Sequence, residues 1–169
     1  MTTCQFIHQT TPTIPVDAIL LPVTGSGHPV GSWTDLHGHG ILKGAVAERA
    51  TQGDIPVGMA VIELTRLESV SAVIRAAVGL EGKPVTEAAL RKAFYYGLMV
   101  AEANQLKTVW MPLEDWLPDG LQKETALQAL AESFRRFRSE SGLLETLTIA
   151  TGDQTVRELA SARFASVLA

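Results

Sequence analysis

Short apolar runs rich in β-forming residues alternate with longer amphipathic segments along most of this 169-residue chain. The alternation predicts an α/β layered domain rather than a helical bundle or a β-sandwich. The run from Asp17 to Thr24 is almost entirely apolar and ends at Gly25-Ser26-Gly27, which is typical of a strand buried on both faces. Further strands are predicted at residues 60–64, 72–78, 107–112 and 144–150, with a candidate edge strand at 4–8.

Three segments carry apolar residues at the three- and four-residue spacing of a helix. They span about residues 84–106, 120–139 and 153–169, and Thr86 is placed to cap the first of them. Thr155 and Glu158 have capping-box spacing near the start of the last. Residues 31–50 also show a helical apolar face, although four glycines weaken its first half. The inward faces of the three helices are predicted to include Leu90, Ala93, Phe94, Gly97, Leu98, Ala101, Leu127, Leu130, Ala131, Phe134, Phe137, Val156, Leu159, Ala160 and Phe164.

The length and the charge of the chain limit the function classes that it fits. Its length predicts one domain, residues 1–169. Because 14 Lys and Arg face 18 Asp and Glu, the net charge is −4, and no dense basic block is present for sequence-independent nucleic-acid binding. The sequence also lacks a membrane-spanning apolar run and the features of a signal peptide. We therefore expect a cytoplasmic protein without nucleic-acid or membrane partners, and the single cysteine, Cys4, excludes an internal disulfide.

Three histidines, His28, His37 and His39, lie within twelve residues of one another and close to Asp35. Imidazole and carboxylate groups are zinc ligands, but His-Gly-His spacing places both rings on one side only in an extended segment. We therefore favour solvated loop histidines over a metal site. The sequence predicts no cofactor.

Acid–base and nucleophilic chemistry also have candidate residues. Glu114 and Asp115 follow a predicted strand, at the edge where open α/β sheets bind ligands. Adjacent carboxylates on a loop usually point apart into water, which favours a role without catalysis. Ser26 and Ser32 are candidate nucleophiles near His28, but no G-x-S-x-G turn accompanies them.

Four segments, in the same order, resemble the macro domains, a family that binds ADP-ribose and related ligands and in some members hydrolyses ADP-ribose linkages. They are Val16 to Leu21, Gly53 to Ile62, Val73 to Ala77, and Thr86 to Pro112. The second is similar to the family's Gly-x-x-Pro-x-Gly-x-Ala-x-Ile turn and strand, and the third to its Val-Ile-His-Ala strand. The resemblance implies an α/β fold, specifically a three-layer α/β/α macro-like domain with a central mixed sheet of about six strands.

The resemblance also implies a ligand site. Asp17 takes the place of the family's aspartate that accepts a hydrogen bond from the adenine amino group, a task that suits an ionised carboxylate. The loop from Gly25 to Gly31 then contributes backbone donors toward the distal ribose and the diphosphate. The ligand-binding residues implied are Asp17, Ala18, Val23, Thr24, Gly25, Ser26, Gly27, His28, Val30, Gly31, Leu113, Glu114, Asp115 and Trp116.

The chain departs from the family's pattern in both ligand loops. The Asn-Ala-Ala-Asn motif is replaced by Leu21-Pro-Val-Thr24, and the glycine-rich second loop by Glu114-Asp-Trp-Leu-Pro-Asp-Gly120. The carboxylates of Glu114 and Asp115 then occupy the place where, in the family, backbone N–H groups bind a diphosphate. This replacement disfavours an anionic ligand. These departures predict a divergent site with weakened or lost activity.

Three hypotheses follow from these residues. The first is a macro-like domain that binds ADP-ribose or a related nucleotide metabolite through Asp17 and the loop from Gly25 to Gly31. The second is an ADP-ribosyl hydrolase with Asp35, Glu114 or Asp115 as general base. The third is a degenerate domain for protein contact or self-association, with Trp33, Trp116 and Leu117 as an apolar patch. The third hypothesis draws on a weaker similarity to the N-terminal, non-catalytic macro-like domain of leucyl aminopeptidases.

Overall fold

A six-stranded mixed sheet forms the centre of the computed structural model, which describes residues 1–12, 15–30, 54–65 and 69–169. The strand order is β1-β6-β5-β2-β4-β3, and every neighbouring pair is parallel except β3 with β4. The strands are β1 (Thr3–His8), β2 (Val16–Thr24), β3 (Ala60–Leu64), β4 (Val70–Gly79), β5 (Thr108–Pro112) and β6 (Thr146–Thr151). All six were predicted from the sequence, with boundaries shifted by one or two residues.

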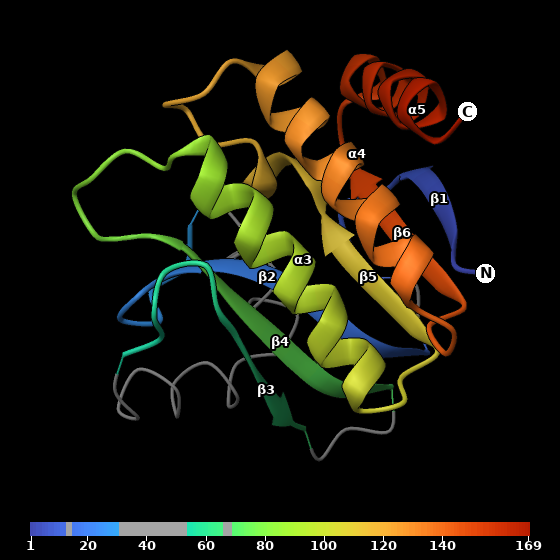
Figure 1. Ribbon diagram of the computed structural model, residues 1–169, viewed down its shortest axis with the longest axis horizontal. Helices are drawn as coiled ribbons and strands as arrows, with labels where there is room; N and C mark the ends of the chain where they lie inside the picture. The colour runs from blue at the N-terminus through green and yellow to red at the C-terminus, as the bar shows by residue number, and fades with distance from the viewer. Residues whose placement is uncertain (13–14, 31–53, 66–68) are drawn as a thin grey trace.

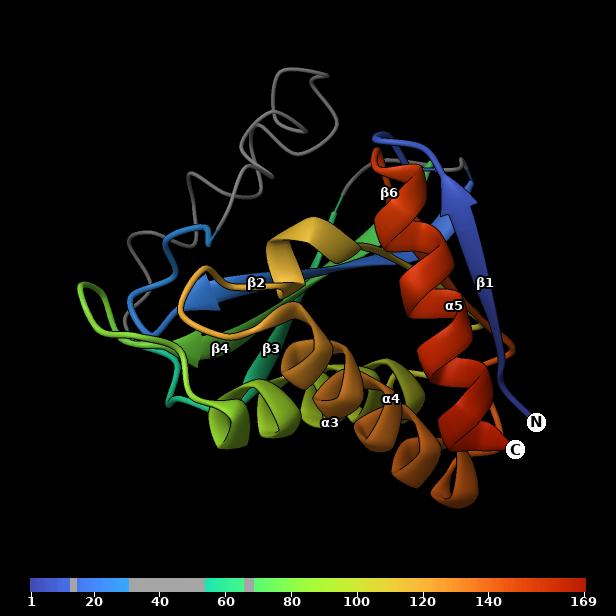
Figure 2. The same ribbon diagram turned by 90° about the horizontal axis from the view of Figure 1, so that it is seen from above.

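The described helices all pack on one face of this sheet (Figures 1 and 2). They are α3 (Glu87–Ala103), α4 (Lys123–Glu140) and α5 (Gln154–Leu168), and a short 3-10 helix, η1 (Leu113–Trp116), follows β5. Their inward faces match the predicted sets, except that Leu159 is only partly buried. Among the described residues, no helix has both the length and the apolar character needed to cross a membrane.

Alternate residues of the central strands supply two separate apolar cores. Leu20 of β2 and Ile74 of β4 face the helices, whereas Ile19 and Val73, one position earlier, belong to a second cluster on the opposite face. Both strands are therefore buried on both faces, as their unbroken apolar runs predict. The α/β class and the mixed six-stranded sheet are confirmed. The layer predicted on the second face, including any helix within residues 31–50, lies outside the described residues.

One predicted helix cap is confirmed and the other is replaced. The Thr86 side chain accepts a hydrogen bond from the Ala89 N–H and caps α3 as expected. At α5 the cap is Asp153, whose carboxylate accepts from the N–H groups of Thr155 and Val156. The predicted capping box of Thr155 with Glu158 is therefore wrong. Asp153 is a strong N-cap residue that stands two positions earlier, so the helix starts there.

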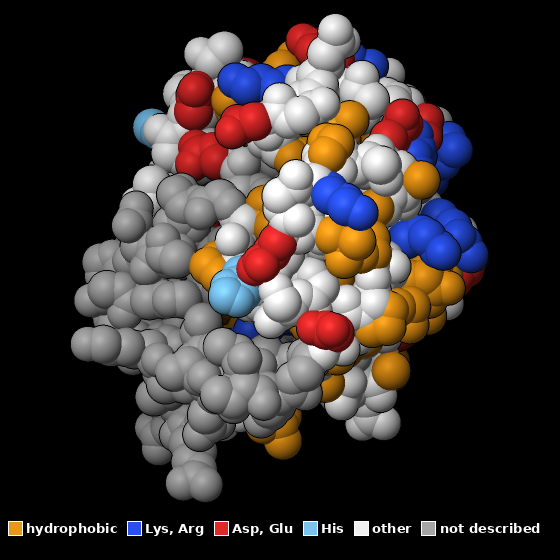
Figure 3. All heavy atoms as spheres, turned by 90° about the vertical axis from the view of Figure 1, so that its left-hand side faces the viewer, with side chains coloured by type: hydrophobic (Ala, Val, Ile, Leu, Met, Phe, Trp, Pro, Cys, Tyr) orange, Lys and Arg blue, Asp and Glu red, His pale blue; other side chains and the backbone are white. Residues whose placement is uncertain are grey.

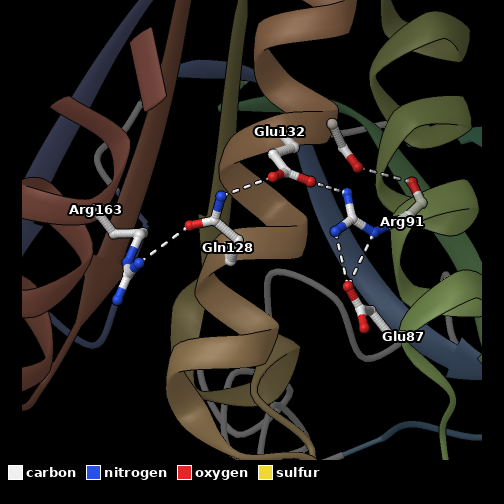
Figure 4. Close-up of polar contacts among 6 residues, drawn as sticks. Glu87, Arg91, Gln128, Glu132 and Arg163 are labelled. Carbon is white, nitrogen blue, oxygen red and sulfur yellow. Dashed lines mark hydrogen bonds and ion pairs between the residues drawn. The ribbon is translucent and has the colours of Figure 1, made fainter. Parts of the chain in front are cut away.

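A chain of polar contacts joins the three helices on their outer side (Figure 4). The Arg91 guanidinium of α3 bonds to Glu87 within its own helix and to Glu132 of α4. Gln128 donates to Glu132 over 2.7 Å, and Arg163 of α5 donates to the Gln128 side-chain oxygen over 3.1 Å. Because these groups are partly exposed, we infer that they fix the positions of the three helices relative to one another and do not form a ligand site.

Glu102, at the carboxyl end of α3, makes the stability of the fold depend on pH. Burial raises its pKa, but hydrogen bonds from the backbone N–H groups of Gly142, Leu143 and Leu144 outweigh burial and hold the pKa below its usual value. A lowered folded-state pKa stabilises the fold above the unfolded-state value of 4.5, and this contribution disappears as the pH falls through the folded-state value. We expect Glu102→Gln to be less stable than the parent at pH 7 and equal to it at the acid end. Urea unfolding between pH 7 and 3 measures the difference, and a gap independent of pH would contradict the assignment.

Candidate functional site

The carboxyl ends of the parallel strands meet at one edge of the sheet, where ligands bind in open α/β folds. The segment that follows β2 there forms a tight turn. The Thr24 N–H donates to the His28 carbonyl over 2.8 Å, and the Gly27 N–H donates to the Thr24 carbonyl over 2.9 Å. The His28 N–H reaches the Thr24 hydroxyl at 3.2 Å, which is itself 3.1 Å from the Ser26 hydroxyl. Gly27 has a φ of +88°, a conformation that favours glycine.

The same turn is tied to its neighbours. The Gly25 N–H donates to the Gly79 carbonyl at the end of β4, and the Ile55 N–H donates to the Gly25 carbonyl. A Cβ atom at Gly25 would lie 3.1 Å from the Ile55 oxygen, so this close approach favours glycine. The Val30 N–H bonds to the Pro22 carbonyl. Most N–H groups of this loop are therefore used inside the protein, which corrects the expectation of a loop with donors free for a diphosphate.

A cavity of about 340 Å³ lies beside this turn. Its wall is largely apolar, and its polar groups are the Ser26 hydroxyl and the exposed carboxylates of Asp54 and Glu81. Glu81 also lies 3.3 Å from the His28 imidazole, with more than half of each side chain exposed. Figure 3 views this side of the molecule, where acidic and histidine side chains lie among apolar ones. The apolar wall consists of Ile55, Pro56, Val57 and Leu80.

Glu114 of η1 does not line this cavity, and its carboxylate is engaged in hydrogen bonds at the end of β6. Its Oε1 accepts hydrogen bonds from the Thr151 hydroxyl and from the Gly152 N–H at 2.9 Å. It therefore ties the segment after β5 to the end of β6. This contact explains the acidic residue in structural terms and weakens the case for Glu114 as a general base.

We expect Glu114→Ala to lower the free energy of unfolding by about 1–2 kcal/mol, because two hydrogen bonds to a charged acceptor are lost. The control is Glu145→Ala, which removes an exposed carboxylate 3.5 Å from the Lys107 amino group and should change stability by less than about 0.5 kcal/mol. Urea unfolding of both variants measures the difference. Equal losses in the two variants would contradict a structural role for Glu114.

The other predicted residues of the second loop are buried. Leu113 and Trp116 are fully buried, and Asp115 is 7% exposed. The Trp116 indole N–H donates to the Leu20 carbonyl over 3.3 Å, and its ring meets Phe94 of α3 edge to face at 5.5 Å. Trp116 is therefore part of the core on the helix side and not a stacking platform for a base.

The structure does not bring Asp17 together with the cavity. Its carboxylate accepts hydrogen bonds from the N–H groups of Lys107 and Thr108 at the start of β5. Asp17 and Thr24 stand at opposite ends of β2, about 23 Å apart at the usual rise of a strand. Ala18 is fully buried among β4 and β5. Asp17 therefore lies at the other end of β2 from the cavity, and its carboxylate is engaged by the start of β5.

The remaining predicted residues divide into two groups. Val23 is fully buried beneath the turn, next to Pro29 in an isolated bridge, so only the residues that follow it reach the surface. Gly31, Asp35, His37 and His39 lie outside the described residues. Within the described part of the chain, no cluster of three or more His, Cys, Asp or Glu residues is arranged to hold a metal ion.

Solved structures share this architecture over nearly the whole chain. A macrodomain variant of Oceanobacillus iheyensis with ADPR superimposes with a TM-score of 0.72 at 14% identity, covering 98% of this chain and 92% of that one. The macrodomain of Mycobacterium tuberculosis DarG gives 0.68 at 13% identity, covering 88% and 98%. A Trypanosoma brucei macrodomain in complex with ADP-ribose gives 0.68 at 18% identity, covering 92% and 64%. The chain has the macrodomain fold. No family model and no curated protein matches its sequence.

Sequence reasoning missed two features of this macrodomain fold. Three separate segments, around residues 25, 55 and 80, build the cavity, and only the first was predicted. The second feature is Arg75, which is fully buried in β4 with its guanidinium 2.8 Å from the Glu63 carboxylate of β3. A charged residue inside an apolar strand was the available signal, because such a residue is buried only with a partner.

Proposed function

We propose that this chain is a macrodomain that binds ADP-ribose or a related nucleotide metabolite in the cavity beside the turn Thr24–Val30. The observation that carries the proposal is the likeness over 98% of the chain to a macrodomain with ADPR. Another Oceanobacillus macrodomain structure contains ADP. The position of the cavity supports the proposal, because it lies at the carboxyl ends of β2 and β4.

We further propose that the site is divergent and favours the ribose part of such a ligand over its diphosphate. Carboxylates accept hydrogen bonds from ribose hydroxyls, and Asp54 and Glu81 flank the cavity. The same carboxylates repel a diphosphate, and the backbone donors of Gly25 and Gly27 are already engaged. The expected affinity is therefore low, with a dissociation constant of roughly 0.1–1 mM.

We propose binding rather than hydrolysis for this site. Of the candidate general bases, Glu114 is engaged by Thr151 and Gly152, and Asp115 is buried. Asp35 lies outside the described residues. Incubation with a mono-ADP-ribosylated protein should leave the modification at the level of the buffer control, and release of ADP-ribose above that level would contradict this part of the proposal.

Isothermal titration with ADP-ribose tests the proposal. Ser26→Trp fills the cavity and should weaken binding by about tenfold or more, because the added indole occupies the space of the ligand. Asp17→Asn, at the opposite end of β2, should leave the affinity unchanged. Absence of binding at millimolar ADP-ribose would overturn the proposal, and equal affinity for the parent and Ser26→Trp would move the site elsewhere.

A further inference from the structure

The outer edge of β1 pairs with no other strand among the described residues. In the described sheet β1 pairs only with β6 and is the outermost strand. The Thr3 N–H points inward to the Glu145 carbonyl, so the N–H and C=O groups of Cys4 and Phe6 point away from the sheet. The Phe6 carbonyl confirms this direction, because the Arg157 guanidinium reaches it from α5 over 3.4 Å. A carbonyl oxygen has two lone pairs, so an added strand would share the Phe6 oxygen with Arg157 and would bond to Cys4 without this competitor.

A groove of about 380 Å³ runs alongside this edge, between β1 and α5. Figures 1 and 2 both show α5 beside β1. The floor of the groove includes Phe6 and Phe164, whose rings meet edge to face at 5.2 Å. Its remaining apolar lining consists of Met1, Cys4, Ala165 and Leu168. An open strand edge next to an apolar groove accepts an extended backbone with an apolar side chain at every second position.

A cation stands at the amino-terminal end of this groove. Arg138 lines it together with Thr2 and is half-buried, and it has no carboxylate partner within the residues that the structure describes. Thr2 fixes that end, because its hydroxyl donates to the Leu144 carbonyl and lies 3.3 Å from the Ser141 hydroxyl near the end of α4. A guanidinium in this setting matches the two oxygens of a carboxylate.

We propose that β1 and α5 form a docking site for an extended peptide that ends in a free carboxylate. The peptide adds to the edge of β1 in the antiparallel direction, which places its carboxyl terminus at the amino end of β1, beside Arg138. Its alternate apolar side chains enter the groove over Phe6 and Phe164. This site is separate from the cavity at the carboxyl ends of β2 and β4, so neither proposal depends on the other.

The test uses the full chain and two pools of seven-residue peptides. In both pools Thr alternates with an equimolar mixture of Val, Ile, Leu and Phe; one pool has free carboxyl termini and the other is amidated. Equilibrium dialysis with mass spectrometry measures the bound fraction. We expect the free-carboxyl pool to bind about tenfold more tightly than the amidated pool, because only its termini pair with Arg138. No binding, or equal binding of the two pools, would overturn the proposal.

Matched variants locate the site. Arg138→Gln should remove the preference for free carboxyl termini, and Arg135→Gln, on the exposed side of the same helix, should retain it. Ala165→Glu places a charge in the groove and should abolish binding, whereas Ala162→Glu on the exposed surface of α5 should not. Thermal unfolding checks that all four variants are folded. Sedimentation adds a further outcome: a dimer of the parent that Ala165→Glu dissociates would replace the peptide by a second copy of the chain and overturn the proposal.

Discussion

Replacing Trp116 by Ala should lower the free energy of unfolding by about 3–5 kcal/mol. The indole is fully buried between β2 and α3, where it contacts Phe94 and donates to the Leu20 carbonyl. Truncation removes this large apolar contact, leaves a cavity, and removes the indole hydrogen bond to the Leu20 carbonyl. Urea unfolding measures the loss.

Trp116→Phe is the matched control. It keeps an aromatic ring against Phe94 but loses the indole N–H and part of the volume, so the expected loss is smaller, about 1–2 kcal/mol. A loss below about 1 kcal/mol for Trp116→Ala would contradict the assignment of this residue to the core. It would restore the alternatives that the residue contacts a ligand or belongs to an exposed apolar patch.

Replacing Glu63 by Leu should cost about 3–5 kcal/mol, because it leaves the charge of fully buried Arg75 without this carboxylate. Arg75 lies on β4 and Glu63 on the neighbouring edge strand β3, so the pair also fixes the register between the two strands. Chemical unfolding gives the size of the loss.

The double variant Glu63→Leu with Arg75→Met tests whether the loss of stability in Glu63→Leu comes from the unpaired charge of Arg75. Apolar side chains of similar volume avoid both desolvation and the unpaired charge, so the double variant should be more stable than Glu63→Leu alone. If the loss in the double variant equalled the sum of the losses in Glu63→Leu and Arg75→Met, the two residues would not act as a pair.

The layered architecture could be predicted from sequence because its signals are local. The continuous apolar run of β2 and the three- and four-residue spacing in α3 and α4 each reflect burial of one short segment. The cap of α5 was misassigned because Asp153 and Thr155 are both good N-cap residues, and only the backbone geometry selects between them.

The site could be predicted only in part because its groups come from distant segments. The resemblance assigned Asp17 and Gly25 to one ligand site, and the extended backbone of β2 separates the two residues. From the sequence, Glu114 and Asp115 were expected to repel an anionic ligand. In the structure Glu114 accepts a hydrogen bond from Thr151, and Asp115 is buried. Of the carboxylates that flank the cavity, Asp54 occupies a variable position of the Gly53 to Ile62 motif and Glu81 lies in no motif, so neither was predicted as a site residue.

Two-dimensional NMR of the backbone amides during a titration with ADP-ribose shows where on the chain this ligand binds. We expect the amide signals of Ser26, Ile55 and Leu80, around the cavity, to shift and those of Lys107 and Thr108 to stay unchanged. Shifts centred on Lys107 and Thr108, beside Asp17, or no shifts at millimolar ligand, would contradict a nucleotide site at the carboxyl ends of β2 and β4.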